Sequence, residues 1–486
     1  MKALQVSKDT NSYGSTPAGG WSVGLGRCDE RAKNRTLLLF LVLCAWSSAT
    51  LFAGESRKAE DWPSLTDDGG WCWFSDPRAV SDNGRTYTGW VTEQGSVQAA
   101  ELVHASGKVK VVTLHEGYER DDHDNPAFLV LPDGRLMAFY SRHGGGRNPG
   151  IQSRVTSRGG DFATWEPEIT LPLHDESGGR AGISYCNPFQ LSDEGNAIYL
   201  FWRGISYKPT MAKSLDGGKT WSSAQPLFSQ AGLPVGNRPY AKYASNGRDR
   251  IHFLFTDGHP RNEPFNSVYY ACYRAGVFYR ADGSRICGAE ELPMLPEQAD
   301  RIYDARATGA RAWIWSIACD EQDRPVVAYT RIPTETDHRY HYARWDGGRW
   351  VDTEICGGGG WFPQTPPGKT ETEPHYSSGL VIDSTDPSVV YLTRPVEGVR
   401  EVERRTTSDG GLTWRMEAVT RESRHDNIRP VVVRNHSSDG PTVLWQSLTG
   451  RYRHFTDYRC SIKAAFVAPA GIGEPVALPG NGDRPR

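Results

Sequence analysis

The sequence lacks long runs of one charge, and it has few long apolar or amphipathic stretches. Its net charge is -3 over 486 residues, with acidic and basic residues interspersed. Without a basic block, binding to nucleic acid is not expected. Beyond the first 53 residues, no apolar stretch is long enough to cross a bilayer. The scarcity of helical periods argues against a helical domain. The 52 glycines and 31 prolines instead favour short strands joined by turns.

Cysteines are also too few and too scattered to form a disulfide framework. Of the nine cysteines, seven follow the N-terminal apolar run, and they are widely spaced and odd in number. They are Cys72, Cys186, Cys272, Cys287, Cys319, Cys356 and Cys460. We therefore expect most of them to be small buried apolar residues.

The N-terminal segment has the residue order of an export signal. Three basic residues between positions 31 and 35 precede the apolar run 37–46, and small residues follow as far as Ala53. This order predicts a secretory signal cleaved near Ala53, and hence a secreted or periplasmic protein. A lipoprotein signal at Cys44 and an uncleaved anchor are the alternatives.

Two-strand units recur along the chain roughly every 50 to 75 residues. In the clearest unit, residues 121–143, a polar segment leads into an apolar strand, and a Pro-Asp-Gly turn joins it to a second strand that ends before His143. Seven such second strands are GRTYTGWV, GRLMAFY, NAIYLFW, DRIHFLF, RPVVAYT, SVVYLTR and PTVLWQS. Seven repeats predict an all-β fold, a seven-bladed β-propeller whose innermost strands surround a central channel.

The predicted propeller occupies residues 59–470. Residues 1–58 are expected to form the extension and signal, and residues 471–486 a flexible C-terminal tail. The last apolar strand, 458–466, is expected to close the ring by pairing with the first blade. Segments 214–221 and 407–414 fit the Asp-box pattern Ser/Thr-x-Asp-x-Gly-x-Thr-Trp, and 157–165 resembles a degraded copy. These boxes are structural turns, so their aspartates are not catalytic candidates.

Polar residues that precede the inner strands, and those that end the second strands, are predicted to share one face of the ring. Three adjacent blades carry most of them. They are His123, Asn125 and His143 from one blade, Tyr185, Asn187 and Arg203 from the next, and Arg238, Tyr240 and Tyr243 from the third. Two histidines at the ends of one hairpin are expected to lie side by side.

The chemistry of these residues suits β-elimination from a uronic-acid polymer. The set has no close carboxylate pair, which argues against ordinary two-carboxylate glycoside hydrolysis. Elimination needs a fixed cation to neutralise the sugar carboxylate, and Arg203 can do this bidentately. A histidine or tyrosine can then remove the proton, and a second group can protonate the leaving oxygen. A tyrosine beside an arginine is expected to have a lowered pKa.

Five motifs make residues 60–467 resemble the bacterial ulvan lyases of the BNR-repeat type, where BNR denotes the bacterial neuraminidase repeat. They are HDNPAF at His123, SRHGGG around His143, YCNPF at Tyr185, FWRG around Arg203 and NRPYAKY from Asn237 to Tyr243. The resemblance implies a seven-bladed propeller that cleaves eliminatively between sulfated rhamnose and uronate.

Carried over to this sequence, the resemblance implies Tyr185 as base and acid, with a shared role in proton transfer for His123 as an alternative. It implies Arg203 as the carboxylate neutraliser, with His143 and Tyr243 as partners in the site. Tyr240 is an alternative to Tyr243, and the roles of His123 and Tyr185 can be exchanged.

A second group of residues is a candidate structural zinc site. Asp257, His259, Cys272 and Cys287 together offer a tetrahedral donor set that would staple one long blade. Their spacing matches no strong zinc motif, and the support comes from the resemblance, which implies a structural metal in this segment. The alternative is that the cysteines are buried apolar residues and His259 a turn residue. No cofactor is expected for catalysis.

Four functions remain open at this point. They are the lyase, a rhamnosidase- or sialidase-like hydrolase on the same propeller, a non-catalytic glycan-binding propeller and a scaffold for protein partners. A sialidase would need an Arg-Ile-Pro tripeptide in its first blade, whereas 331–333 lies in the fifth. The expected partner is an anionic polysaccharide, and the expected state is a monomer without membrane contact beyond the signal or anchor.

Overall fold

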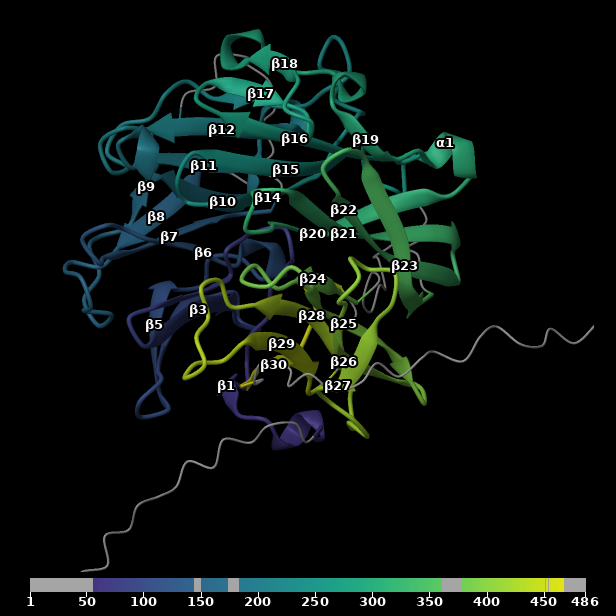
Figure 1. Ribbon diagram of the computed structural model, residues 1–486. Helices are drawn as coiled ribbons and strands as arrows, with labels where there is room; N and C mark the ends of the chain where they lie inside the picture. The colour runs from purple at the N-terminus through teal and green to yellow at the C-terminus, as the bar shows by residue number, and fades with distance from the viewer. Residues whose placement is uncertain are drawn as a thin grey trace, which may run out of the picture. The chain divides into compact units, whose positions relative to one another are not determined.

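The computed structural model describes residues 56–143, 150–173, 183–360, 378–450, 452 and 454–466. Its strands form seven antiparallel sheets in chain order, the blades of a β-propeller (Figure 1). The predicted signal, the expected cleavage near Ala53 and the C-terminal tail lie outside the described residues. Within them, no helix is long and apolar enough to span a membrane.

The first three blades each contain four strands, written here from the innermost outward. Blade one has β2 (Ala79–Asp82), β3 (Arg85–Val91), β4 (Val97–Val103) and β5 (Lys108–His115). Blade two has β6 (Ala127–Val130), β7 (Leu136–Ser141), β8 (Ile151–Val155) and β9 (Ile169–Thr170). Blade three has β10 (Ser184–Leu191), β11 (Ala197–Arg203), β12 (Pro209–Ser214) and β13 (Gln225–Pro226).

The fourth blade has six strands and is larger than the others. It has β14 (Ala241–Ser245), β15 (Arg250–Thr256), β16 (Val268–Arg274), β17 (Val277–Tyr279) and β18 (Arg285–Gly288), with β19 (Asp300–Tyr303) also paired to β16. Blade five has β20 (Arg311–Cys319), β21 (Pro325–Thr334), β22 (Asp337–Trp345) and β23 (Trp350–Gly359). Blade six has β24 (Leu380–Ile382), β25 (Val389–Val396), β26 (Val399–Thr406) and β27 (Arg415–Ala418).

The seventh blade joins the two ends of the propeller. It has β28 (Asn427–Val432), β29 (Val443–Leu448), β30 (Cys460–Ala465) and, as its outermost strand, β1 (Ser64–Thr66). In Figure 1 the purple β1 lies beside the yellow β30. The expectation that the last strand pairs with the first blade is therefore wrong in detail. Instead, β1 precedes blade one in the sequence and adds the outermost strand of blade seven, so the two ends of the propeller are joined in one sheet.

The helical segments are single turns in the connections between strands. They are η1 (Ala59–Asp61), η2 (Asp122–Asp124), η3 (Ser192–Glu194), η4 (Ile205–Tyr207), η5 (Ala289–Glu291), η6 (Pro296–Gln298) and α1 (Ala305–Thr308). The turn η2 carries His123, one of the predicted site residues.

The core lies between the blades, and this position explains why the second strand of each blade is apolar at most positions. All seven predicted second strands are the second strands of their blades, and most of their residues are buried. Between blades three and four, the Tyr243 ring stacks on Phe201 at 4.7 Å and meets Phe253 edge-on at 5.8 Å. Strands that are buried on both faces need apolar residues at nearly every position rather than strict alternation.

The two full Asp-box segments form closed hydrogen-bonded turns. Asp216 accepts hydrogen bonds from the backbone N–H and hydroxyl groups of Thr220, and the Trp221 indole donates to the Gly218 carbonyl. Asp409 makes the same bonds to Thr413. Because these carboxylates are saturated by their own turns, they are structural.

Candidate active site

An inner segment, residues 71–78, precedes the first blade and forms one wall of the site. The Cys72 N–H donates to the Asp122 carbonyl at 2.8 Å and to the Asn125 side-chain oxygen at 3.1 Å. The Trp73 ring stacks on Trp315 at 4.6 Å. Phe74 packs against three site aromatics, at centroid distances of 4.9 to 5.3 Å: Tyr185, Tyr240 and Trp313. This wall was not predicted from the sequence, although an aromatic run before the first strand was its visible signal.

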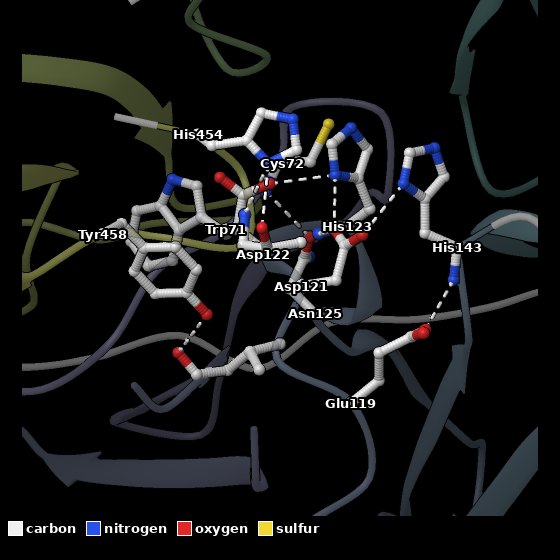
Figure 2. A network of polar contacts seen from close by, with 12 residues as sticks. Trp71, Cys72, Glu119, Asp121, Asp122, His123, Asn125, His143, His454 and Tyr458 are labelled. Atoms are coloured by element: carbon white, nitrogen blue, oxygen red, sulfur yellow. Dashed lines mark hydrogen bonds and ion pairs between the residues drawn. The ribbon is translucent and has the colours of Figure 1, made fainter. Parts of the chain in front are cut away.

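His123 and His143 lie side by side, as the hairpin predicted. Their rings stack with centroids 4.0 Å apart and planes within 8°. One carboxylate holds both, because Asp121 Oδ1 lies 2.7 Å from Nδ1 of His123 and Asp121 Oδ2 lies 2.9 Å from Nδ1 of His143. Figure 2 shows Asp121 contacting both imidazoles, whose other ring nitrogens point away from it.

The shared carboxylate fixes the proton positions on both rings. The neighbouring histidines keep the pKa of Asp121 below its usual value despite burial, so the carboxylate accepts and each Nδ1 must donate. Burial and the adjacent His123 lower the pKa of His143 to about 4. For His123, burial favours the neutral ring, but Cys72, Tyr185 and Asp121 raise its pKa well above the usual value. Near neutral pH, His143 thus offers a bare Nε2 and His123 a protonated one.

Tyr185 lies beside the histidine pair in a strained conformation. Its φ is 68°, in the left-handed region, where the register of β10 against β11 shifts between Ser184 and Asn187. Such bulges redirect side chains and are common at active sites. The Tyr185 ring lies 5.5 Å from His123 and 6.1 Å from His143. The expected lowering of its pKa is wrong, because burial and Tyr240 raise it well above the usual value and outweigh His123 and Arg203.

Arg203, the last residue of β11, is buried among phenol rings. Its guanidinium carbon lies 4.9 Å from the Tyr185 ring, 5.4 Å from Tyr240 and 5.8 Å from Tyr207, and Nη1 donates to the Tyr240 hydroxyl at 2.5 Å. Only 9% of the residue is exposed, and Nε has no hydrogen-bond partner among the described residues. No carboxylate of the described residues forms an ion pair with Arg203. A buried, unneutralised guanidinium is suited to receive an anionic ligand.

The predicted substrate-binding residues divide into contacts within the site and supports behind it. The side-chain oxygen of Asn125 accepts from the Cys72 N–H, and Asn187 binds the backbone of Phe74, Asp76 and Tyr185. Both asparagines are buried, so they hold the inner segment in place. Arg238 stacks over the Tyr207 ring at 4.2 Å, at the half-buried edge of the site.

Of the two candidate tyrosines, Tyr240 is the one in contact with Arg203. Tyr243 lines the same small cavity, but its ring packs on Phe201 and Phe253 in the core between blades. The difference follows from position, because Tyr240 precedes β14, whereas Tyr243 lies within it and shares a face of the sheet with Phe253 of β15.

The four predicted zinc ligands do not converge. On β16, β17 and β18, Tyr273 lies opposite Phe278, and Phe278 lies opposite Cys287, so these three side chains share one face of the sheet. Cys272 precedes Tyr273 and therefore faces the opposite side. Two thiols on opposite faces of one sheet cannot bind the same ion.

The other two predicted ligands have partners of their own. Asp257 accepts from the Ser267 N–H at 2.8 Å and the Tyr269 hydroxyl at 3.0 Å. The ring of His259 lies 5.6 Å from Tyr240, at the margin of the candidate active site. Among the described residues, three groups of side chains have donor atoms close enough to hold a metal, and none of these groups includes a predicted zinc ligand.

The histidine pair itself belongs to two metal-like groupings. Donor atoms of Asp121, His123 and His143 lie within 4.8 Å of one another, as do those of Cys72, Asp122 and His123. However, Asp121 lies at hydrogen-bond distance from both Nδ1 atoms, and an ion with bonds of about 2 Å to each partner would separate them further. The observed contacts are those of shared protons.

Several residues that shape the site were missed from the sequence. Asp121 is the most important, and its place two residues before His123 was the available signal. Phe455, from the connection before β30, contacts the rings of His123 and His143 edge-on at 4.9 and 5.1 Å. Phe455 lies far from His123 in the sequence, so only closure of the ring brings it against the two histidines.

Asp122 connects η2 to the last blade through a buried ion pair. Its Oδ2 accepts from Arg429 Nη1 at 2.5 Å and from the Tyr452 hydroxyl at 2.6 Å. Arg429 also donates to the Trp71 carbonyl at 2.8 Å. This network fastens the inner segment and the histidine turn to blade seven.

Replacing Asp122 with asparagine is expected to lower the free energy of unfolding by about 3–5 kcal/mol, because it leaves Arg429 buried without its counter-charge. Arg429 keeps the pKa of Asp122 below its usual value despite burial, so the carboxylate stabilises the fold at neutral pH and loses this effect on acidification. Urea unfolding of the wild type and the variant, at neutral and at acidic pH, would measure the loss of stability and its dependence on pH. Asp133→Asn, at a half-exposed turn, should change stability by less than about 0.5 kcal/mol. Equal losses in the two variants would contradict the prediction.

The fold and site together define a seven-bladed propeller protein with a polar cluster at the inner ends of blades one to four. A family model described as "BNR repeat-containing family member" matches residues 85–356, more than half of the chain. The chain belongs to this BNR repeat-containing family.

The proteins similar to this chain include two curated relatives and a solved structure. The relatives are the ulvan lyase of family PL25 from Pseudoalteromonas sp. (strain PLSV), 23% identical over 324 residues, and an ulvan lyase from Alteromonas sp. (strain LOR), 22% identical over 326. Each match covers 57% of this chain and 62% or 63% of the relative. A structure of a PL25 ulvan lyase bound to -[GlcA(1-4)Rha3S]- superposes with a TM-score of 0.62 at 17% identity, covering 83% of this chain and 95% of the other. This superposition supports the propeller fold.

Proposed function

We propose that this protein is a polysaccharide lyase that cleaves a uronate-containing polysaccharide by β-elimination, with an ulvan-like rhamnose-uronate polymer as its substrate. The observation that carries the proposal is Arg203, a buried cation with no carboxylate partner among the described residues. Elimination beside a sugar carboxylate needs such a cation, because the carboxylate must be neutralised before the adjacent C–H becomes acidic. The relatives named as ulvan lyases support the same reaction class.

We assign the roles of base and acid from the protonation state that the pKa shift of each site residue favours near neutral pH. The neutral His143, with its free Nε2, is suited to remove the proton from the carbon beside the carboxylate. Tyr185 remains a phenol, because its pKa is raised, and is therefore suited to protonate the leaving glycosidic oxygen. His123 keeps its proton and supplies positive charge beside the developing enolate. Groups whose pKa values are driven apart by their surroundings are the usual acid and base pairs.

The direct test mixes the purified protein with ulvan and follows ultraviolet absorbance. Elimination forms a C4–C5 double bond conjugated to the carboxylate, which absorbs, whereas hydrolysis forms none. Rising absorbance with shortening chains supports the lyase. Released sugar or shorter chains without absorbance would instead support the hydrolase, and binding without cleavage would support a glycan-binding propeller.

Replacing Tyr185 with phenylalanine is expected to lower kcat by roughly 100-fold or more, because the general acid is lost while the ring and its contacts remain. KM should change little, since Arg203 still binds the carboxylate. Steady-state kinetics from the same absorbance assay would measure the split. Tyr243→Phe serves as the matched control, because its ring lies in the core between blades. Equal losses in both variants would contradict the assignment.

The dependence of kcat/KM on pH is expected to have an acidic limb near pH 4, the value to which burial and His123 lower the pKa of His143. Below this pH, His143 becomes protonated and cannot act as base. The alkaline limb should lie above the usual histidine pKa, because His123 must keep a proton whose pKa is raised. A pH–rate profile checks both limbs. An acidic limb at the ordinary histidine value would show that His143 is not the base.

A further inference from the structure

Three metal-binding side chains meet where the fourth and fifth blades adjoin. His252 lies on β15, Cys319 ends β20, and Asp323 lies in the turn between β20 and β21. Their donor atoms all lie within 4.8 Å of one another. His252 is near the start of β15, whereas Thr256 at the end of that strand accepts the Tyr240 N–H. The cluster therefore lies near the opposite end of β15 from the candidate active site and has no part in the chemistry of that site.

The imidazole of His252 lacks one of the partners that a buried ring needs. The residue is fully buried, with 0% of its surface exposed, and Nδ1 lies 2.8 Å from the Tyr270 hydroxyl. Nε2 is also buried but has no hydrogen-bond partner among the described residues. Buried polar atoms in native proteins are nearly always satisfied, so the unpartnered nitrogen of a ring grouped with a thiol and a carboxylate is a position that a bound ligand would satisfy.

The strand next to His252 offers a candidate fourth donor, Cys272, which lies outside the group of three. Cys272 lies directly opposite His252 in the pairing of β15 with β16, so the two side chains share a face of the sheet. The Cys272 thiol is buried, and burial is the main cause that raises its pKa to about 12. Arg250 and a hydrogen bond with Tyr270 lower this pKa, whereas Asp323 and Cys319 raise it, which places Cys272 within electrostatic range of Asp323 and Cys319.

We propose that His252, Cys272, Cys319 and Asp323 form a structural zinc site that joins blades four and five. One nitrogen, two sulfur and one oxygen donor make a closed tetrahedral set for Zn²⁺, and the thiolates disfavour Mg²⁺ and Ca²⁺. His252 would bind through Nε2, while its Nδ1–H donates to Tyr270, the kind of outer hydrogen bond that orients metal-bound histidines.

The surrounding charges suit this complex. Zn²⁺ bound by two thiolates and one carboxylate carries one net negative charge. The Arg250 guanidinium lies 3.9 Å from Asp323, and Arg248 lies 3.6 Å from it, so both can offset that charge. The site differs from the Asp257 and Cys287 set predicted from the sequence, and it does not depend on the proposed function.

The test is the zinc content of the whole purified chain, loaded with zinc and then dialysed. Elemental analysis should give about one zinc per chain, and a chelator should lower the melting temperature. His252→Gln and Cys319→Ser should each lose the zinc. Cys287→Ser should keep it, because that thiol is equally buried in the same blade but faces the other side. Substitution with Co²⁺ would add an independent reading, since thiolate-to-cobalt absorption should be present in the wild type and weakened in Cys319→Ser.

Three outcomes would overturn the proposal. The first is a wild-type chain that takes up no zinc after loading, and the second is retention of zinc by both His252→Gln and Cys319→Ser. Zinc lost from Cys287→Ser but kept in Cys319→Ser would assign the metal to the set predicted from the sequence. Circular dichroism of each variant separates loss of zinc from loss of the fold, and the conservative His252→Cys variant should recover part of the zinc if Nε2 is a ligand.

Discussion

Replacing Arg203 with methionine is expected to lower kcat/KM on a uronate polysaccharide by about 1000-fold or more. The loss of one neutral oxyanion donor typically lowers kcat by about 100- to 1000-fold, and a charged group that neutralises a carboxylate contributes at least as much. Arg203→Lys should recover only part of the activity, because an ammonium cannot pair with the carboxylate bidentately. The absorbance assay over a range of substrate concentrations measures both variants.

The same variant should be as stable as the wild type, or more stable. A buried cation without a carboxylate partner destabilises a fold, so its replacement by an apolar side chain of similar length removes that penalty. Arg331→Met is the matched control, because Arg331 lies on the second strand of blade five and pairs with Asp352. It should lose stability and keep activity. If Arg203→Met instead unfolds the protein, Arg203 is a structural residue and the proposed function loses its main support.

Replacing Asp121 with asparagine is expected to lower kcat/KM by about 1000-fold. Asp121 accepts from Nδ1 of both histidines, whereas an asparagine side chain can accept from one and must present its N–H₂ to the other. The imidazole that faces the amide N–H₂ loses its acceptor at Asp121, and among the described residues only His123 has another carboxylate oxygen nearby, Asp122 Oδ1 at 3.0 Å from its Nδ1. The comparable change in serine proteases costs about 10⁴ in kcat. Without the carboxylate charge, the pKa of His123 should fall, so the alkaline limb of the pH profile should move to lower pH.

Asp124 provides a close control for this variant. It lies on the same turn and is equally buried, but burial, Asp121 and Glu119 raise its pKa well above the usual carboxyl value. A protonated carboxyl group resembles an amide in shape and charge, so Asp124→Asn should change kcat/KM and its pH profile little. Equal losses in the Asp121 and Asp124 variants would indicate damage to η2 rather than loss of the shared carboxylate.

The sequence predicted the blades well because strand and turn signals are local. Each second strand combines β-branched and aromatic residues over a short run bounded by turn residues, and all seven lie where expected. The hairpin that carries His123 and His143 was likewise predictable, because a two-strand unit places its two ends at one edge. Closure of the ring was predicted less accurately, since β1 has only three residues and its partner lies at the other end of the chain.

Side-chain direction and protonation were not predictable from the sequence. Tyr240 and Tyr243 are three residues apart, and only the start of β14 decides which of them reaches Arg203. The pKa of Tyr185 depends on competition between burial and Arg203, and burial is a property of the packed molecule. The predicted zinc set contained two cysteines that alternation along neighbouring strands places on opposite faces.

By itself, the sequence determined an all-β propeller with seven blades, and it identified His123, His143, Tyr185 and Arg203 as residues of one site. These features follow from strand and turn patterns that are local in the sequence and do not depend on how the blades are packed together. The tertiary structure alone decided that Asp121 holds both histidines, that Arg203 has no counter-charge among the described residues, and that His252 meets Cys319 from the neighbouring blade. Each of these depends on distances between segments that are far apart in the chain, and closure of the ring fixes those distances.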